Sequence, residues 1–395
     1  MRAIKFVLLI LCFASSYALS VTDAVQQKID KQVKLLNNAI KTDEQAEVLI
    51  IGKDIKRKKA IRDDGFNEPS FQLIDVCSVC YIFEPDGAVS TVYLRKAKEI
   101  DVQLVSKVGS IKHILITRAK VKNFKHIERI KDLVYLSIFE SKFDRDTISL
   151  SNKSLTYITI KYVDIKEILL GSLQNSKYIN LSRNKIENIK GLQNIESVET
   201  LNLKDNKIAD LSGLKSLKKL KNLFLYKNPI KDVSFLVNKP ALEELEIVLE
   251  APKEQYQLFA DMKNLKKLLI QAPNNINSFA DLPEMPSLQV LNIPGGARYS
   301  TDSSIGLRGM KGLERFNNLK KLVLNSHNFK KVEGLEHLPH LEDLHINYTP
   351  IEDWSGLSKV SEKLEVLYAV EAKAPGVGRV EEIETLRKKG VMVFD

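Results

Sequence analysis

The sequence INLSRNKI at Ile179–Ile186 returns twice downstream at a constant interval. Leu201–Ile208 reads LNLKDNKI and Leu223–Ile230 reads LFLYKNPI, so successive copies begin 22 residues apart. In all three, two apolar residues separated by one position are followed by an asparagine and then by another apolar residue. This spacing is the pattern of a leucine-rich repeat, which predicts one solenoid coil per copy.

The chemistry of one copy explains the pattern. Alternate residues of a strand face opposite sides, so the two apolar residues of each copy point into the core. The asparagine turns the chain and its amide can bond to neighbouring backbone, which predicts a ladder of Asn184, Asn206 and Asn228. A single coil cannot bury its apolar side alone, so neighbouring coils must stack. We therefore expect an α/β leucine-rich-repeat horseshoe solenoid with a parallel sheet on its concave face.

The same interval, extended in both directions, finds weaker copies. Most steps are 21 to 23 residues, but one is 31 residues and contains an insertion from Gly295 to Gly312, which is either a binding loop or merely tolerated. The ladder position of the weaker copies holds Ser141, His327 or Thr349, or apolar Ala97, Ala119 or Val163. The repeats are expected over residues 91–366, followed by a closing repeat over 367–395. The predicted strands carry their first apolar residue at Val92, Ile114, Leu136, Ile158, Ile179, Leu201, Leu223, Leu245, Leu268, Leu291, Leu322, Leu344 and Leu367.

The copies resemble the internalin-like and phosphatase-regulator-like class of leucine-rich-repeat proteins over residues 91–395. The resemblance rests on the three clear copies and on the apolar residues that follow each asparagine, as in Ile186-Glu187-Asn188-Ile189. It implies a protein-binding concave face. The chain departs from surface-anchored internalins in showing no sorting signal and no immunoglobulin-like or wall-binding module, so wall anchoring is not expected.

The first residues predict export. A basic start at Arg2 and Lys5 is followed by an apolar run from Phe6 to Ala14 and by small residues up to Ala18. This is the order of a secretory signal peptide, which we place at residues 1–18. The alternative is an uncleaved anchor, but the run is shorter than the roughly 20 apolar residues that a spanning helix needs. A secreted or periplasmic chain is expected, which argues against the cytoplasmic phosphatase-regulator role.

Caps are predicted at both ends of the array, because terminal coils must cover an open core. Residues 19–90 are expected to form a helical and hairpin cap. It comprises an amphipathic helix over Val21–Lys41, a second helical stretch near Glu44–Ile61, and a hairpin of Phe71–Phe83 with Val89–Leu94. At the other end, a helix over Val380–Lys389 ends at Gly390 and a final strand follows.

Cys77 and Cys80 are the two cysteines that remain after cleavage. Their strand-like surroundings and an oxidising compartment favour a local disulfide bond between them. Free thiols and a redox Cys-x-x-Cys motif are the alternatives, although that motif normally opens a helix after a strand.

The residues beside the inward apolar positions are expected to form the binding face. Tyrosine and arginine are common in protein–protein hot spots, and lysines attract acidic groups. The alternative is that aromatic residues simply suit exposed strands. The predicted protein-binding residues are Tyr157, Lys161, Tyr162, Tyr178, Arg183, Lys204, Phe224, Tyr226 and Lys227.

Catalysis is not expected. No nucleophile elbow, zinc-protease or phosphate-loop motif occurs, so neither a catalytic residue, a metal nor a cofactor is predicted. The formal net charge is +10, or +8 without Arg2 and Lys5, and the basic residues are scattered among acids, which argues against a nucleic-acid surface. The charge does suit an acidic surface, so the alternative function is an envelope- or polysaccharide-binding structural protein. No stable membrane insertion is expected.

Overall fold

The computed structural model describes residues 23–42, 47–50, 58–61, 67–70, 79–84, 86–95, 97–271, 276–295, 306–378 and 380–395. In the three short segments 47–50, 58–61 and 67–70 it describes the backbone alone. The chain divides into two compact units, residues 1–186 and 187–395. The expected signal peptide (residues 1–18), Cys77 and most of the 295–312 insertion lie outside the described residues.

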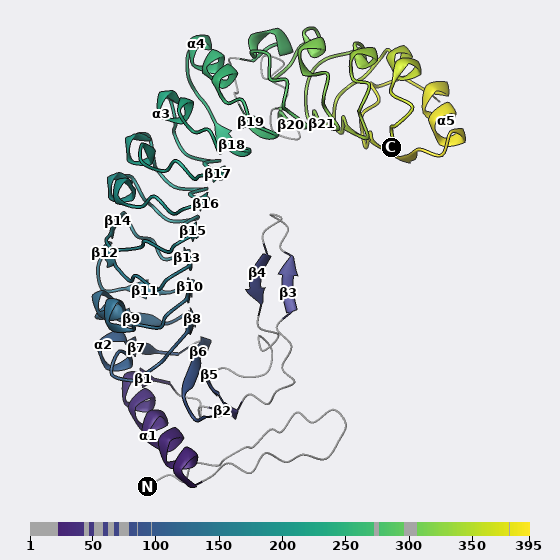
Figure 1. Ribbon diagram of the computed structural model, residues 1–395. Coiled ribbons are helices and arrows are strands. Elements are labelled where there is room, and N and C mark those ends of the chain that lie inside the picture. Colours follow the sequence, from purple (N-terminus) through teal and green to yellow (C-terminus); the bar gives the residue numbers. More distant parts are fainter. Residues whose placement is uncertain are drawn as a thin grey trace. The chain divides into compact units, whose positions relative to one another are not determined.

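Unit 1 is built around a mainly parallel sheet (Figure 1). Val92, Ile114, Leu136, Ile158 and Ile179 are register partners on successive strands, as the repeat interval predicts. The other side of the coils carries β7 (Glu99–Asp101), β9 (Lys120–Lys122), β11 (Lys142–Phe143), β12 (Thr147–Leu150), β14 (Glu167–Leu170), α2 (Val102–Val105) and η1 (Phe124–Arg129). The strands of the main sheet are, in order, β2 (Glu47–Ile50), β5 (Val79–Phe83), β6 (Val89–Arg95), β8 (His113–Thr117), β10 (Tyr135–Phe139), β13 (Tyr157–Lys161) and β15 (Tyr178–Asn180).

Unit 2 repeats the same coil with an all-parallel sheet. Leu201, Leu223, Leu245, Leu268, Leu291, Leu322, Leu344 and Leu367 are register partners in turn. Its strands are β16 (Thr200–Asn202), β17 (Asn222–Phe224), β18 (Glu244–Val248), β19 (Lys267–Gln271), β20 (Val290–Asn292), β21 (Lys321–Val323), β22 (Asp343–His345), β23 (Val366–Tyr368) and β24 (Met392–Phe394).

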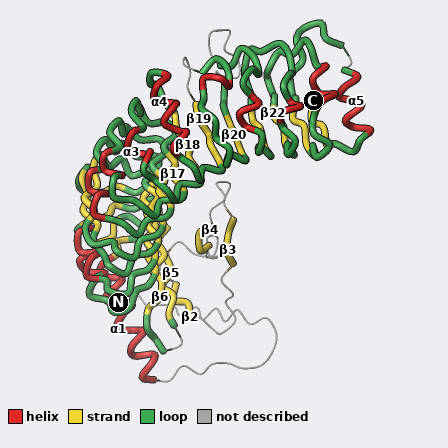
Figure 2. Tube along the Cα trace, turned by 45° about the horizontal axis from the view of Figure 1, so that its top comes forward, coloured by secondary structure: helices red, strands yellow, loops and turns green. Residues whose placement is uncertain are grey.

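Short helices form the return segments of unit 2 and lie on the side of each coil opposite its strand (Figure 2). Leu211, Leu214, Leu217 and Leu220 are fully buried along one such segment, as their spacing predicts. The helices are η2 (Lys190–Asn194), η3 (Ser212–Leu214), α3 (Ser234–Val237), α4 (Lys253–Gln257), η4 (Leu258–Asp261), η5 (Phe279–Asp281), η6 (Leu313–Phe316), η7 (Leu335–His337) and η8 (Ser355–Lys359).

The predicted asparagine ladder is present, and Asn184 shows how it works. Its Nδ2 donates to the carbonyl oxygens of Leu181 in its own coil and Ile160 in the preceding coil, both at 2.8 Å. Its Oδ1 accepts from the Val163 amide at 3.0 Å. One side chain therefore satisfies three backbone groups, which would otherwise be buried without partners at a cost of about 1–3 kcal/mol each.

Where the ladder position holds serine or threonine in place of asparagine, the side chain makes the same kind of hydrogen bond to the backbone. Ser141 Oγ donates to the Phe139 carbonyl at 2.9 Å and accepts from the Ala119 amide at 3.2 Å. Thr349 Oγ1 donates to the Leu324 carbonyl at 3.3 Å. A hydroxyl can both donate and accept, so it replaces part of the amide's function where asparagine is missing.

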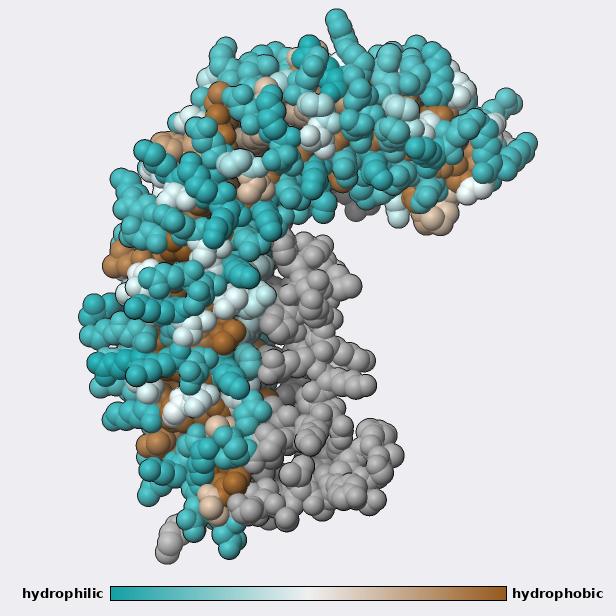
Figure 3. All heavy atoms as spheres, viewed as in Figure 1, coloured by the Kyte–Doolittle hydropathy of each residue, from teal (hydrophilic) through white to brown (hydrophobic). Residues whose placement is uncertain are grey.

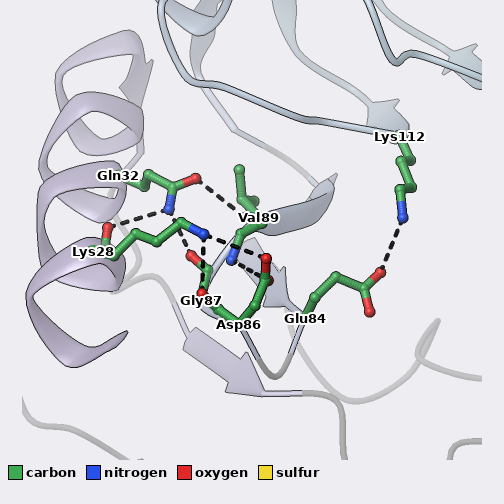
Figure 4. Close-up of polar contacts among 8 residues, drawn as sticks. Lys28, Gln32, Glu84, Asp86, Gly87, Val89 and Lys112 are labelled. Carbon is green, nitrogen blue, oxygen red and sulfur yellow. Dashed lines mark hydrogen bonds and ion pairs between the residues drawn. The ribbon is translucent and has the colours of Figure 1, made fainter. Parts of the chain in front are cut away.

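A helix caps the first strands of unit 1 (Figure 4). It is α1 (Asp23–Ala39), which lies within the predicted Val21–Lys41 helix. Gln32 Nε2 donates to the Gly87 carbonyl at 2.7 Å and its Oε1 accepts from the Val89 amide at 3.1 Å. Lys28 reaches the Asp86 carbonyl at 3.0 Å. These bonds join α1 to the turn between β5 and β6, whose antiparallel pairing confirms the hairpin expected from Val89–Leu94.

The expected second helix over Glu44–Ile61 is wrong. Two of its segments are strands: β2, and β3 (Lys58–Ile61), which pairs antiparallel with β4 (Asn67–Ser70). The reason for β2 is its run of Val48, Leu49 and Ile50, which suits a strand, and the open side of β5, with which it pairs in parallel.

The closing repeat agrees with its prediction. Helix α5 (Glu381–Lys388) is followed by Gly390 at φ +89°, where a residue without Cβ ends the helix without strain. Strand β24 then pairs in parallel with β23. Ile383 and Leu386 are the buried residues of α5.

Close contact between return segments makes Gly213 a sensitive position. A Cβ there would lie 2.1 Å from the carbonyl oxygen of Ile189 in the preceding coil. We expect Gly213→Ala to lower the free energy of unfolding by about 1–3 kcal/mol, because backbone must shift to admit the methyl group. Gly309→Ala is the control, since its Cβ would meet nothing within 4 Å. Equal denaturation midpoints for the two variants would contradict this explanation.

Candidate functional site

The first concave column of unit 1 is aromatic. His113, Tyr135, Tyr157 and Tyr178 are register partners on β8, β10, β13 and β15. Their ring centroids follow one another at 6.5, 6.5 and 6.3 Å with tilted planes. On β13 the buried Ile158 and Ile160 alternate with Tyr157 and Lys161, so Tyr157 and Lys161 lie on the face opposite the core.

A second aromatic group follows where the strands of unit 1 end. The Tyr162 ring meets Phe139 edge-on, with centroids 5.1 Å apart, and the Arg183 guanidinium lies 4.9 Å from the Tyr162 centroid. We call Phe139, Tyr162 and Arg183 the turn cluster. Tyr162 is 39% exposed and Arg183 is also exposed. A guanidinium stacked on a tyrosine presents apolar area and charge together, which suits a protein contact.

The backbone at the turn cluster has an unusual conformation that recurs along the repeats. Tyr162 has φ +55° and Arg183 φ +60°, and the Tyr162 amide donates to the Arg183 carbonyl at 3.0 Å. Arg118 and Glu140 occupy the same position in earlier coils, also with positive φ, and form an ion pair at 2.5 Å. The left-handed residue ends each strand and directs its side chain away from the core, so the turn itself presents these side chains.

In unit 2, the predicted binding residues Lys204, Phe224 and Tyr226 make contacts with one another or with neighbouring side chains of the sheet. Lys204 lies 4.9 Å from the Phe224 ring centroid and forms an ion pair with Glu246. Tyr226 Oη donates to Gln271 Oε1 at 2.9 Å, and burial together with the charge of Glu246 raises the pKa of Tyr226. Since an acid already neutralises Lys204, this lysine is a weaker attractor of acidic groups than the sequence suggested.

Burial separates the nine predicted residues into three sets. Tyr178 is 6% exposed and Phe224 1% exposed, so neither presents a free ring. The prediction treated both as exposed because alternation places them opposite the core, but neighbouring side chains can still cover that face. Tyr157, Lys161, Lys204 and Tyr226 are half-buried, and Tyr162, Arg183 and Lys227 are exposed. Their binding role stays a prediction.

The sequence reading missed several aromatic residues on the same columns. His113, Tyr135 and Phe139 lie upstream of the residues considered. Near the C-terminus, Tyr368 stacks on His345 with centroids 4.3 Å apart and on Phe394 with centroids 4.7 Å apart. The repeat register was a sufficient signal for all of these residues except Phe394, because they occupy concave positions in coils that the interval had already identified, whereas Phe394 lies on β24 beyond the last of them.

Cys80 is completely buried on β5 and takes part in a disulfide bond. Cys77 lies outside the described residues, so its pairing with Cys80 remains a prediction.

Among the residues that the structure describes, no group of three or more His, Cys, Asp or Glu side chains is placed to hold a metal ion. In the same residues, no helix has both the length and the apolar character needed to cross a bilayer. The visible surface of the described residues is mainly hydrophilic, with smaller hydrophobic patches between (Figure 3).

These coils define a leucine-rich-repeat protein. A sequence profile described as Leucine Rich repeats (2 copies) matches residues 196–238. The fold is internalin-like: an internalin from Listeria monocytogenes superposes with a TM-score of 0.56 at 15% identity, covering 78% of this chain and 86% of that one. The functional domain of InlJ from the same species gives a TM-score of 0.49 at 15% identity, with 72% and 64% covered. No curated protein matches the chain by sequence. Leucine-rich-repeat solenoids as a class are interaction scaffolds with extended concave surfaces.

Proposed function

We propose that this chain is a secreted scaffold that binds a protein partner, at a host or cell surface, on the concave side of its repeats. The observation that carries the proposal is the turn cluster of unit 1. It combines an exposed tyrosine, a stacked arginine and a second aromatic ring on neighbouring coils. Aromatic and arginine side chains of this kind supply most of the affinity in protein interfaces.

The aromatic column of unit 1 supports the same proposal. Its four rings follow one another across neighbouring strands, and Tyr157, which is half-buried while the other three are buried, is the member that a partner lying across the sheet could contact. Such a surface needs no catalytic group, which agrees with the scaffold character of the fold class.

The test begins with a pull-down from host-cell surface and envelope extracts at low and high salt, using the chain from residue 19 onward. A protein partner should be retained at high salt, because apolar aromatic contacts are weakly screened, whereas polyanions should be lost. Recovery of polyanions alone would favour the structural, polysaccharide-binding alternative.

Mutation of the turn cluster then tests the location. We expect Tyr162→Ala/Arg183→Ala to weaken binding of the retained protein at least tenfold, because truncating hot-spot residues costs about 2 kcal/mol or more. The thermal midpoint should change little, since both side chains are exposed. Tyr348→Ala is the control, because Tyr348 has the same left-handed backbone, with φ +58°, in unit 2. An undiminished affinity in the double variant would refute the location.

A further inference from the structure

A row of mostly charged residues precedes the strands of unit 2, and one of its positions holds a neutral glutamine. Each member lies one residue before its strand, and the backbone amide of each donates to the carbonyl of the preceding member at 2.7–2.8 Å. Acid and base alternate over the first four members, the fifth member is a neutral glutamine, and two adjoining acids end the row. The row reads Glu199, Lys221, Glu243, Lys266, Gln289, Lys320, Glu342 and Glu365.

Ion pairs join three of the adjoining acids and bases of this row. Lys221 bonds to Glu199 at 2.9 Å, and Glu199 and Glu243 together raise its pKa. Lys266 pairs with Glu243 at 2.9 Å and Lys320 with Glu342 at 3.3 Å. Lys221 therefore has an acid on both sides, whereas Lys266 and Lys320 each have an acid on one side and Gln289 on the other.

An open hollow of about 470 Å³ lies at the neutral glutamine of the row. Lys266 and Lys320 flank it, about 10 Å apart along the row because two strand spacings of about 4.8 Å separate them. No acid is among its lining residues, which are Asn264, Lys266, Pro286, Ser287, Gln289, Asn318, Lys320 and His340. The hollow thus has a lysine on each side, each paired with one acid of the row that lies outside the hollow, and polar side chains but no carboxylate between them.

The neutral lining residues supply both hydrogen-bond acceptors and a donor. Asn264 Nδ2 donates to the Pro240 carbonyl at 2.6 Å and Asn318 Nδ2 to the Pro286 carbonyl at 2.7 Å, which fixes both amides and leaves their oxygens as acceptors. His340 Nδ1 accepts from Lys363 Nζ at 3.1 Å, so its Nε2–H is a donor. The side-chain amide of Gln289 makes no hydrogen bond with any residue that the structure describes.

We propose that this hollow binds an acidic sugar, whose carboxylate lies between Lys266 and Lys320 over Gln289 and whose hydroxyls meet the fixed amides. The ligand's carboxylate would stand where the row holds no acid between its two lysines. The volume exceeds what a small inorganic anion needs and falls in the range of small-molecule sites. This site lies on unit 2 and does not depend on the turn cluster.

Calorimetric titration of the full chain tests the proposal, with a hexasaccharide of alternating glucuronate and N-acetylglucosamine as the probe and neutral chitohexaose as the comparison. We expect the acidic sugar to bind at least tenfold more tightly than the neutral one. Lys266→Gln/Lys320→Gln should weaken that binding at least tenfold. Lys221→Gln/Lys330→Gln is the matched control, because these lysines are equally exposed and ion-paired, to Glu199 and Glu352, but do not line the hollow.

A third variant distinguishes a site that needs one carboxylate at Gln289 from non-specific attraction of anions to surface lysines. Gln289→Glu supplies the carboxylate from within the row, so it should abolish binding of the hexasaccharide and raise the thermal midpoint. Retained affinity in Gln289→Glu would overturn the proposal, as would equal loss in both lysine pairs. Equally tight binding of inorganic sulfate or of a poly-glutamate peptide would also overturn it, because either would show charge recognition without sugar recognition.

Discussion

Replacing Asn228 with alanine is expected to lower the free energy of unfolding by about 3 kcal/mol or more. Its Nδ2 donates to the carbonyls of Leu203 and Leu225, both at 2.9 Å, and its Oδ1 accepts from the Ile208 amide at 3.0 Å. All three backbone groups are buried in stacked coils, and each unsatisfied group costs about 1–3 kcal/mol. Denaturant unfolding of the variant and the parent measures the difference.

Asn188→Ala is the control for this prediction. The exposed Asn188 makes one hydrogen bond, accepting from the Lys190 amide at 2.9 Å, and water can replace that bond. We expect a loss of about 1 kcal/mol or less. A loss in Asn228→Ala no larger than that of Asn188→Ala would mean that the ladder contributes little to stability.

The second large effect concerns His327, the ladder residue in the coil after the insertion. Its side chain is 1% exposed, and its Nε2 bonds to the Ile293 carbonyl at 2.7 Å while Nδ1 accepts from the Leu307 amide at 3.0 Å. A carbonyl can only accept and an amide N–H can only donate, so the ring is neutral with its hydrogen on Nε2. Neutral histidine thus replaces asparagine, with one donor and one acceptor.

Acid should therefore destabilise the protein through His327. Burial lowers the pKa of His327 from 6.5 to about 4. Between these pH values the unfolded chain binds more protons than the folded chain, so stability is complete above pH 6.5 and decreases as pH falls toward 4. The contribution of this residue over that interval is about 3 kcal/mol.

His327→Asn tests the assignment, since the amide keeps a donor and an acceptor but does not titrate. Unfolding midpoints of the two proteins measured from pH 7.5 to pH 4 should converge in acid: the parent loses stability below pH 6.5 faster than the variant. Parallel pH profiles would show that His327 is not responsible. The parent is expected to be the more stable protein at pH 7.5, because the smaller amide leaves part of the histidine's space unfilled.

The strand register and the ladder were predictable because they rest on local periodicity. The interval placed Leu245, Leu268 and Leu344 correctly without any structural information. The second helix was predicted wrongly, since Val48–Ile50 form a strand next to β5, and pairing between distant segments leaves no mark in a local pattern. The register also gave the positions of the nine predicted binding residues along their strands and turns, but their exposure depends on neighbours in adjacent coils, as the buried Phe224 shows.

The sequence by itself determined the coil: its length, its inward residues and the hydrogen-bonding residue at its turn. These follow from alternation along a strand and from the need of every coil to bury its apolar side. Only the tertiary structure decided which side chains meet between coils. The stacking of Arg183 on Tyr162 and the neutralisation of Lys204 by Glu246 join residues about one or two repeats apart. The hollow between Lys266 and Lys320 likewise brings together residues about two repeats apart. Contacts of this kind depend on side-chain conformations and on the distance between neighbouring strands, neither of which a repeat pattern specifies.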